Sequence, residues 1–117
     1  MLTVTKIFEF EAAHYLPDYD GKCKDLHGHS YKLEVEVSND KRVKKGYPEM
    51  LVDFGDIKKI VNDHVIDVMD HKVLNTIFDY PTAEFMVKDI FITLSNYFFV
   101  ERVRLWETST SYAEYRR

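Results

Sequence analysis

The sequence predicts an α+β fold of order ββααββ, in which a four-stranded antiparallel sheet carries two helices on one face. Two segments near the N-terminus alternate apolar and polar residues with a period of two, as half-buried strands do. Two central segments repeat apolar residues every three or four positions, as amphipathic helices do. Two short alternating segments near the C-terminus complete the sheet, and its single apolar face leaves one side for both helices.

The two N-terminal strands are expected at residues 4–14 and 27–38. In the first strand, every second residue from Val4 is apolar except Lys6, and the series ends in a histidine. Its members on this face are Val4, Phe8, Phe10, Ala12 and His14. In the second, the apolar parity begins with two histidines: His27, His29, Tyr31, Leu33, Val35 and Val37. Side chains two positions apart on a strand point the same way, so all three histidines are expected on the apolar face. A basic loop containing Lys41, Arg42, Lys44 and Lys45 follows.

The first helix is expected to begin after Asp53, whose side chain can cap it, and the second after Thr82. The stripe of the first helix has a histidine in register with its apolar members: Ile57, Ile60, Val61, His64, Val65 and Val68. Glu84 in the first turn of the second helix is favourable at the positive end of the helix dipole. Its buried side is expected to comprise Phe85, Met86, Ile90, Leu94 and Tyr97. Two strands at about residues 102–107 and 112–115 follow.

Length and composition narrow the class of protein. A chain of 117 residues with 45% hydrophobic and 31% charged residues predicts one globular domain over residues 1–117. No run approaches the roughly 20 apolar residues of a membrane span, and the N-terminus lacks the pattern of a signal peptide. A net charge of −4 argues against a general nucleic-acid binder. One cysteine excludes an intrachain disulfide framework and suits the reducing cytoplasm.

The three histidines are the strongest candidates for chemistry. His27 and His29 start one strand on the same face, roughly 7 Å apart by strand rise. If the first two strands form a hairpin, His14 comes across to join them. Three neutral imidazoles with an open fourth position are the ligand set of a catalytic zinc ion. The alternative is that these histidines are polar strand ends at the mouth of a loop.

Cys23 and the pair Asp70-His71 are further candidates. Cys23 lies four residues before His27, between two lysines, and could act as a base, a nucleophile or a fourth zinc ligand. It could also be an inert surface thiol. A histidine oriented by a carboxylate is a general acid–base unit, which Asp70 and His71 would form. The alternative for this pair is an exposed, polar helix end.

Glu107 shares the parity of Val103 and Leu105 on the third long strand. A carboxylate on a core face is costly unless it is paired or hydrogen-bonded. Its two acceptor oxygens would suit the adjacent N–H donors of a guanidine-like heterocycle edge. The competing interpretation is that strand curvature or the following turn exposes Glu107 to solvent.

Six motifs spread over residues 8–108 occur together: Phe10-Glu11-Ala12-Ala13-His14, Cys23-x-x-x-His27-Gly28-His29-Ser30, Val52-Asp53-Phe54, Asp70-His71-x-x-Leu74-Asn75, Pro81-Thr82-x-Glu84 and Glu107-Thr108. In this order and spacing they resemble the 6-pyruvoyltetrahydropterin synthase / 6-carboxytetrahydropterin synthase family. The resemblance implies a tunnelling fold (T-fold), in which three subunits join their sheets into a barrel and two trimers usually stack as a hexamer.

The resemblance also implies the roles of the candidate residues. Zinc would be bound by His14, His27 and His29. The pterin ring would be bound by Glu107 at a subunit interface, with Thr82 and Thr108 also in the substrate site. Cys23 would accept a proton, and Asp70 with His71 would form the partner relay.

The spacing around Cys23 indicates which reaction to expect. Three residues separate Cys23 from His27, a gap that resembles the carboxy-type enzymes of the 7-deazaguanine (queuosine or archaeosine) route. Such an enzyme converts 7,8-dihydroneopterin triphosphate into 6-carboxy-5,6,7,8-tetrahydropterin, acetaldehyde and triphosphate. One alternative is a 6-pyruvoyltetrahydropterin synthase, which stops at a diketone. Another is a non-catalytic zinc- or pterin-binding assembly protein, against which the presence of both a base and a relay argues.

Overall fold

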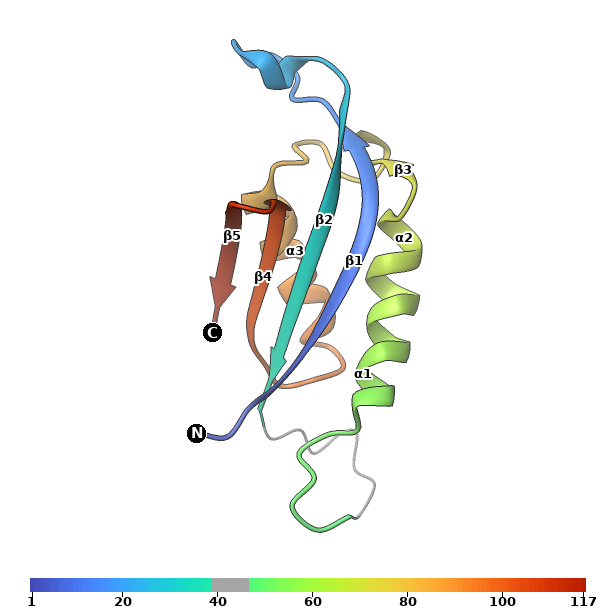
Figure 1. Cartoon of the computed structure of the whole chain (residues 1–117), viewed down its shortest axis with the longest axis vertical. Helices are drawn as coiled ribbons and strands as arrows, with labels where there is room; N and C mark the ends of the chain where they lie inside the picture. Colours follow the sequence, from blue (N-terminus) through green and yellow to red (C-terminus); the bar gives the residue numbers. More distant parts are fainter. Residues whose placement is uncertain (39–46) are drawn as a thin grey trace.

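A mixed five-stranded sheet is the frame of the molecule, described by a computed structural model over residues 1–38 and 47–117 (Figure 1). Its long strands are antiparallel neighbours, as predicted: β1 (Val4–His14), β2 (His27–Val37), β4 (Val100–Thr108) and β5 (Ser111–Arg116). The strand order is β3-β1-β2-β4-β5. The predicted basic loop at 41–45 lies outside the described residues.

The sheet has one strand more than the four that the sequence predicts. β3 (Lys72–Val73) pairs in parallel with Ala12 and Ala13 of β1, at the edge of the sheet. The connection before β3 is already attached to β1, because the backbone N–H of His71 donates to the carbonyl of Glu11. Two residues are too short a segment to show alternation, so the sequence carries no signal for this strand.

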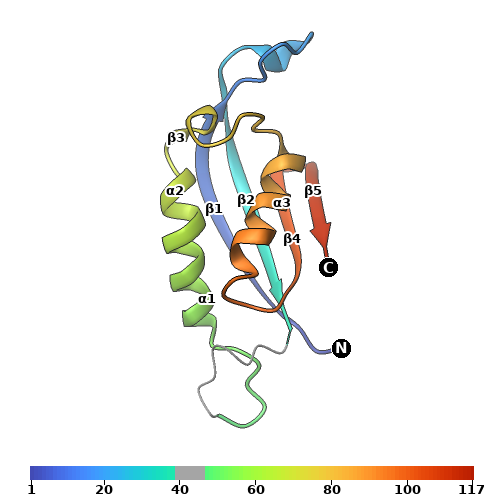
Figure 2. The same ribbon diagram turned by 180° about the vertical axis from the view of Figure 1, so that it is seen from behind.

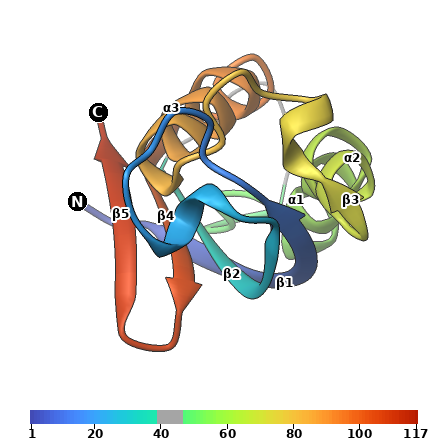
Figure 3. The same cartoon turned by 90° about the horizontal axis from the view of Figure 1, so that it is seen from above.

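Both helical segments cover the same face of the sheet (Figures 2 and 3). The first segment comprises α1 (Phe54–Val61), a π-helical turn η2 (Asn62–Ile66) and α2 (Asp67–Met69). Asp53 caps α1 as predicted, because its carboxylate accepts a hydrogen bond from the backbone N–H of Gly55 at 2.7 Å.

The π-helical turn explains why part of the predicted stripe is wrong. The buried residues of this segment are spaced by four: Ile57, Val61, Val65 and Met69. A spacing of four drifts around an α-helix of 3.6 residues per turn, and the wider π turn compensates for that drift. Val68 is therefore 41% exposed, and His64 lies outside the core, where its ring stacks on Tyr97.

The second helix, α3 (Ala83–Leu94), begins as predicted. The Thr82 hydroxyl accepts a hydrogen bond from the backbone N–H of Phe85 at 3.1 Å. Its predicted buried side is confirmed for three residues: Met86, Ile90 and Leu94. Phe85 was assigned wrongly, since its side chain is 47% exposed beside Phe78 at the start of the helix. The helix also ends before Tyr97, which packs against the core from the following turn.

The core fills the space between the helices and the inner face of the sheet. In β2 the core residues alternate with half-buried polar ones, and the completely buried members are Leu33, Val35 and Val37. Burying a side chain of this size contributes about 1.5–3 kcal/mol. Within the described residues, no helix has the length and hydropathy needed to cross a bilayer.

Candidate metal centre

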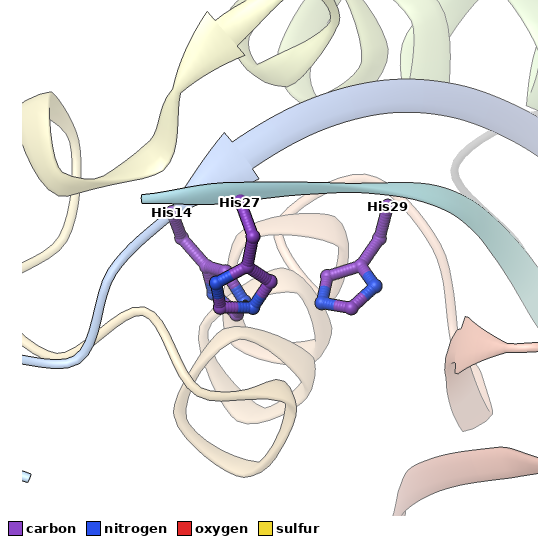
Figure 4. A group of neighbouring side chains, drawn as sticks. All are labelled: His14, His27 and His29. Carbon is purple, nitrogen blue, oxygen red and sulfur yellow. The ribbon is translucent and has the colours of Figure 1, made fainter. Parts of the chain in front are cut away.

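Three histidines converge where the β1–β2 hairpin ends. His14 lies directly opposite His27 in the register, and His29 lies opposite Ala12. Alternation along both strands directs all three imidazoles to the helix-covered side, as Figure 4 shows. One ring nitrogen of each lies within 4.8 Å of the others. The predicted grouping of these residues is confirmed.

Hydrogen bonds to backbone carbonyls fix two of these rings. Nδ1 of His14 donates to the carbonyl of Pro81 at 2.7 Å, and Nδ1 of His27 donates to the carbonyl of Asp25 at 2.7 Å. A carbonyl oxygen only accepts, so both Nδ1 atoms carry hydrogen and both neutral rings keep their lone pair on Nε2. These two Nε2 atoms face each other at 3.0 Å. Lone pairs repel at that distance unless a cation shares them, so the pair fits a divalent metal.

His29 completes the donor set. Its Nε2 is buried and has no hydrogen-bond partner among the described residues. Burial lowers the pKa of His29, an effect that the nearby carboxylate of Glu107 opposes and the other two histidines reinforce. A neutral imidazole is the form that binds a metal. An arrangement of three imidazoles fits zinc with one position open for another ligand.

Glu107 reaches this group from β4. One of its carboxylate oxygens lies 3.5 Å from Nε2 of His29, and its side chain is 27% exposed. The neighbours on its parity, Val103 and Leu105, are completely buried. Parity therefore predicted the correct face for Glu107, and the partial exposure shows that the site opens to solvent beside it.

Tyr31 is a member of the site that sequence reasoning placed only in the apolar face. Its side chain is 1% exposed and stacks on Phe10, with ring centroids 5.0 Å apart. Its ring also contacts His29 and His14 edge-on, at centroid distances of 5.6 and 6.3 Å. The hydroxyl is buried without a hydrogen-bond partner among the described residues. Burial, reinforced by Glu107, raises the pKa of Tyr31, so its hydroxyl stays protonated.

Asp70 and His71 form a pair at the edge of the sheet. Nδ1 of His71 lies 2.9 Å from a carboxylate oxygen of Asp70, although adjacent residues rarely pair in this way. The backbone N–H of Glu11 donates to the same carboxylate, and this bond, with that to His71, lowers the pKa of Asp70. His71 has a φ of 60°, a left-handed backbone conformation that residues other than glycine seldom adopt.

The Asp70–His71 pair lies beside the end of the β1–β2 hairpin that bears the histidines. His71 borders a hollow that is lined by Glu11 and Ser30, which alternate with the inward-facing residues, and also by His29. No hydrogen bond or ring contact joins His71 to the three histidines in the part of the chain that the structure describes. In a single chain the two predicted parts of the site lie at the same end of the hairpin but make no side-chain contact with each other among the described residues.

Cys23 lies in the loop between β1 and β2, which projects beyond the end of the sheet (Figure 1). It occupies a short 3-10 turn, η1 (Lys22–Lys24), and is partly exposed. Its carbonyl accepts a hydrogen bond from the backbone N–H of Leu16 at 2.8 Å, which closes the loop at its base. Among the described residues, the group whose ligand atoms converge comprises only histidines and does not include Cys23.

The two predicted substrate-binding threonines make local hydrogen bonds. Thr82 caps α3, and its neighbour Pro81 supplies the carbonyl that orients His14. Thr108 lies at the end of β4, where its hydroxyl accepts a hydrogen bond from the backbone N–H of Thr110 at 3.3 Å. Thr82 thus connects the start of α3 to the metal group.

Comparisons with known proteins agree with this geometry. The family model described as 6-pyruvoyl tetrahydropterin synthase matches residues 3–117. A 6-carboxy-5,6,7,8-tetrahydropterin synthase from Haemophilus influenzae is 36% identical, with 99% of each chain covered. One from Synechocystis is 37% identical, covering 98% of this chain and 93% of its own. The solved 6-pyruvoyl tetrahydropterin synthase of Caenorhabditis elegans has the same fold, with a TM-score of 0.82 at 23% identity, covering 99% of this chain and 95% of its own.

Proposed function

The chain belongs to the 6-pyruvoyl tetrahydropterin synthase family, and from that premise we propose that it is a zinc-dependent 6-carboxy-5,6,7,8-tetrahydropterin synthase. Its substrate is 7,8-dihydroneopterin triphosphate, which loses triphosphate and then, with addition of one water molecule, two side-chain carbons as acetaldehyde. The full-length relatives of this name favour the carboxy product over the pyruvoyl product. The proposed enzyme is a single domain, works in the cytoplasm and serves the synthesis of 7-deazaguanine compounds.

The observation that carries this proposal is the pair of Nε2 atoms of His14 and His27, 3.0 Å apart with both Nδ1 atoms bound to carbonyls. Together with the buried Nε2 of His29, they are a donor set for zinc that leaves a position open. When bound there, zinc supplies stabilisation of the negative charge that develops on the substrate's side-chain oxygens.

Glu107 is the proposed anchor of the pterin ring. Its carboxylate can accept two hydrogen bonds side by side, from the amino group and the adjacent ring N–H of the pterin. Because Glu107 lies beside His29, a ring bound there extends its side chain toward the three histidines. Thr108 and Thr82 are the proposed polar neighbours of the bound ring. This arrangement orients the substrate without any contribution from the phosphates.

The proton-transfer groups are Cys23 and the pair Asp70-His71. Cys23 as a thiolate takes a proton from the substrate side chain, and His71, oriented by Asp70, moves a proton on the opposite face. Among the described residues of a single chain, neither Asp70 nor His71 makes a side-chain contact with the three histidines. We therefore infer that the working site lies between subunits, so that this pair serves the histidines of a neighbouring copy.

Metal removal tests the proposal. Protein stripped of metal by a chelator is expected to lose consumption of 7,8-dihydroneopterin triphosphate, and one equivalent of zinc per chain should restore it. Binding of oxidised neopterin, followed by fluorescence, is the parallel measurement, because Glu107 should still bind the ring without zinc. Full turnover by metal-free protein would refute the zinc-dependent reaction, whereas ring binding without any turnover in zinc-loaded protein would favour the non-catalytic alternative.

A further inference from the structure

Two buried polar atoms without a partner belong to side chains of β2 whose rings contact each other. They are Nε2 of His29 and the hydroxyl of Tyr31, and neither has a hydrogen bond within the described residues. A buried donor or acceptor that has lost its contact with water is costly unless a partner replaces that contact. The metal accounts for His29. It does not account for Tyr31, because a neutral tyrosine hydroxyl offers a proton and the three imidazoles already supply the ligand set of a zinc site.

The register of the sheet points to Glu107 as the acceptor for this hydroxyl. The pairing of β2 with β4 ends with Lys32 opposite Trp106, and its continuation by one residue would set Tyr31 opposite Glu107. Both side chains project on the helix-covered face, where directly opposed residues are neighbours. At present the Glu107 carboxylate is turned toward His29, at 3.5 Å from its Nε2.

Metal binding at His29 would change the orientation that the Glu107 carboxylate prefers. Once the lone pair of His29 Nε2 is used by a metal, that nitrogen offers Glu107 neither a proton nor a hydrogen bond. The carboxylate then has the Tyr31 hydroxyl as the adjacent donor. A carboxylate has about four lone-pair positions, so it can accept from Tyr31 and still present two acceptors to the edge of a pterin.

We propose that Tyr31 is a positioning residue whose hydroxyl donates a hydrogen bond to the Glu107 carboxylate and holds it in the orientation that binds the pterin ring. This inference rests on the proposed role of Glu107 as the pterin anchor. Packing alone does not call for a hydroxyl here, since the ring of a phenylalanine would stack on Phe10 equally well. A buried hydroxyl without a hydrogen bond lowers the stability of the protein, and a functional partner for it would explain why Tyr31 has one.

The test is a double-mutant cycle on zinc-loaded protein, with oxidised neopterin as the titrant. Glu107→Gln and Tyr31→Phe are each expected to weaken binding at least tenfold. The double variant should bind no more weakly than Glu107→Gln alone, because the hydroxyl acts only through the carboxylate. Tyr115→Phe is the matched control: Tyr115 lies on β5 and packs on Phe91, and its variant should bind as wild type does.

Two further readouts separate positioning from structure. Zinc content should be the same in all variants, and the melting temperature of metal-free Tyr31→Phe should equal or exceed that of wild type. Unchanged affinity in Tyr31→Phe, a loss of zinc in it, or losses that add in the double variant would each overturn the inference. Wild-type affinity in Glu107→Gln would instead remove the pterin anchor of the proposed function, and the inference with it.

Discussion

The three histidines of the metal group have different surroundings, which set the orientation and the protonation of their rings. Carbonyls of Pro81 and Asp25 fix two rings by their Nδ1 atoms, and burial lowers the pKa of the third against the opposing effect of Glu107. Such outer contacts orient metal ligands and make them more basic. The three rings are thus oriented for a cation before one binds. We therefore predict that zinc binding depends on each of the three imidazoles.

Replacing His29 by alanine should empty the site. Two imidazoles rarely hold zinc tightly while leaving positions open, so His29→Ala should retain little zinc after dialysis, measured by elemental analysis. His64→Ala is the matched control, because His64 is exposed and stacks only on Tyr97 among the described rings. Full zinc occupancy in His29→Ala would disprove the assignment of His29 as a ligand.

Cys23→Ala should keep zinc and fold but lose turnover. If the thiol is a general base, its removal acts mainly on kcat, by roughly 10²–10⁴. Cys23→Ser offers a comparison of similar size with a far weaker base. The measurement is steady-state kinetics beside elemental analysis of the same preparations. A parallel loss of zinc would make Cys23 a ligand, contrary to its position outside the converging group.

Among the elements, the β1–β2 hairpin does most to build the site. Both strands have 11 residues and pair in unbroken register from Val4 with Val37 to His14 with His27. A slip by one residue would move the histidines to the other face, so the apolar pattern that fixes the core also fixes the metal group. For this reason alternation, together with the expected hairpin, predicted the grouping of the three histidines.

The start of α3 is the second element that the site depends on, and its cap can be tested. Thr82→Ala removes the hydroxyl that accepts from the backbone N–H of Phe85 and should cost about 1 kcal/mol of stability. Thermal melts should show a melting temperature a few degrees lower, while Thr82→Ser should stay close to wild type. If Thr82→Ala melts like wild type, the cap contributes nothing measurable to the stability of the fold.

Other elements could not be predicted because no pattern in the sequence encodes them. The π-helical turn over Asn62–Ile66 shifts the buried face from Val68 to Met69, which a fixed helical period cannot anticipate. β3 forms because Asp70 and His71 bind the edge of β1, a long-range contact. The role of Tyr31 in the site could not be predicted either. An apolar pattern shows that its side chain is buried, but not that its hydroxyl lacks a hydrogen-bond partner.

At the scale of the whole molecule, the edges of the sheet are the open question that the fold raises. Among the described residues, β5 pairs only with β4, and β1 pairs with β3 over two residues alone. Free strand edges are templates for pairing with another chain, which proteins cover or block. Within the described ranges, Asp70 and His71 make no side-chain contact with the histidines of their own chain, which also leads us to expect association with other copies. An assembly would pair the free strand edges and could bring the proton-transfer groups to the histidines of a neighbouring copy.

Solution mass tests that assembly. The chain has a mass of 13.9 kDa, and light scattering after gel filtration should give about three or six times that value, for a trimer or a dimer of trimers. Mixing inactive His29→Ala with inactive His71→Ala, after dissociation and reassociation, should restore part of the activity, because each supplies what the other lacks. A fully active monomer would contradict the shared site.

The central claim is the reaction itself, and product analysis tests it most directly. Zinc-loaded protein is incubated with 7,8-dihydroneopterin triphosphate under anaerobic conditions, and the products are identified by mass spectrometry, with acetaldehyde trapped as a hydrazone. We predict 6-carboxy-5,6,7,8-tetrahydropterin and acetaldehyde in equal amounts, together with triphosphate. A diketo pterin without acetaldehyde, or recovery of unchanged substrate, would contradict the account.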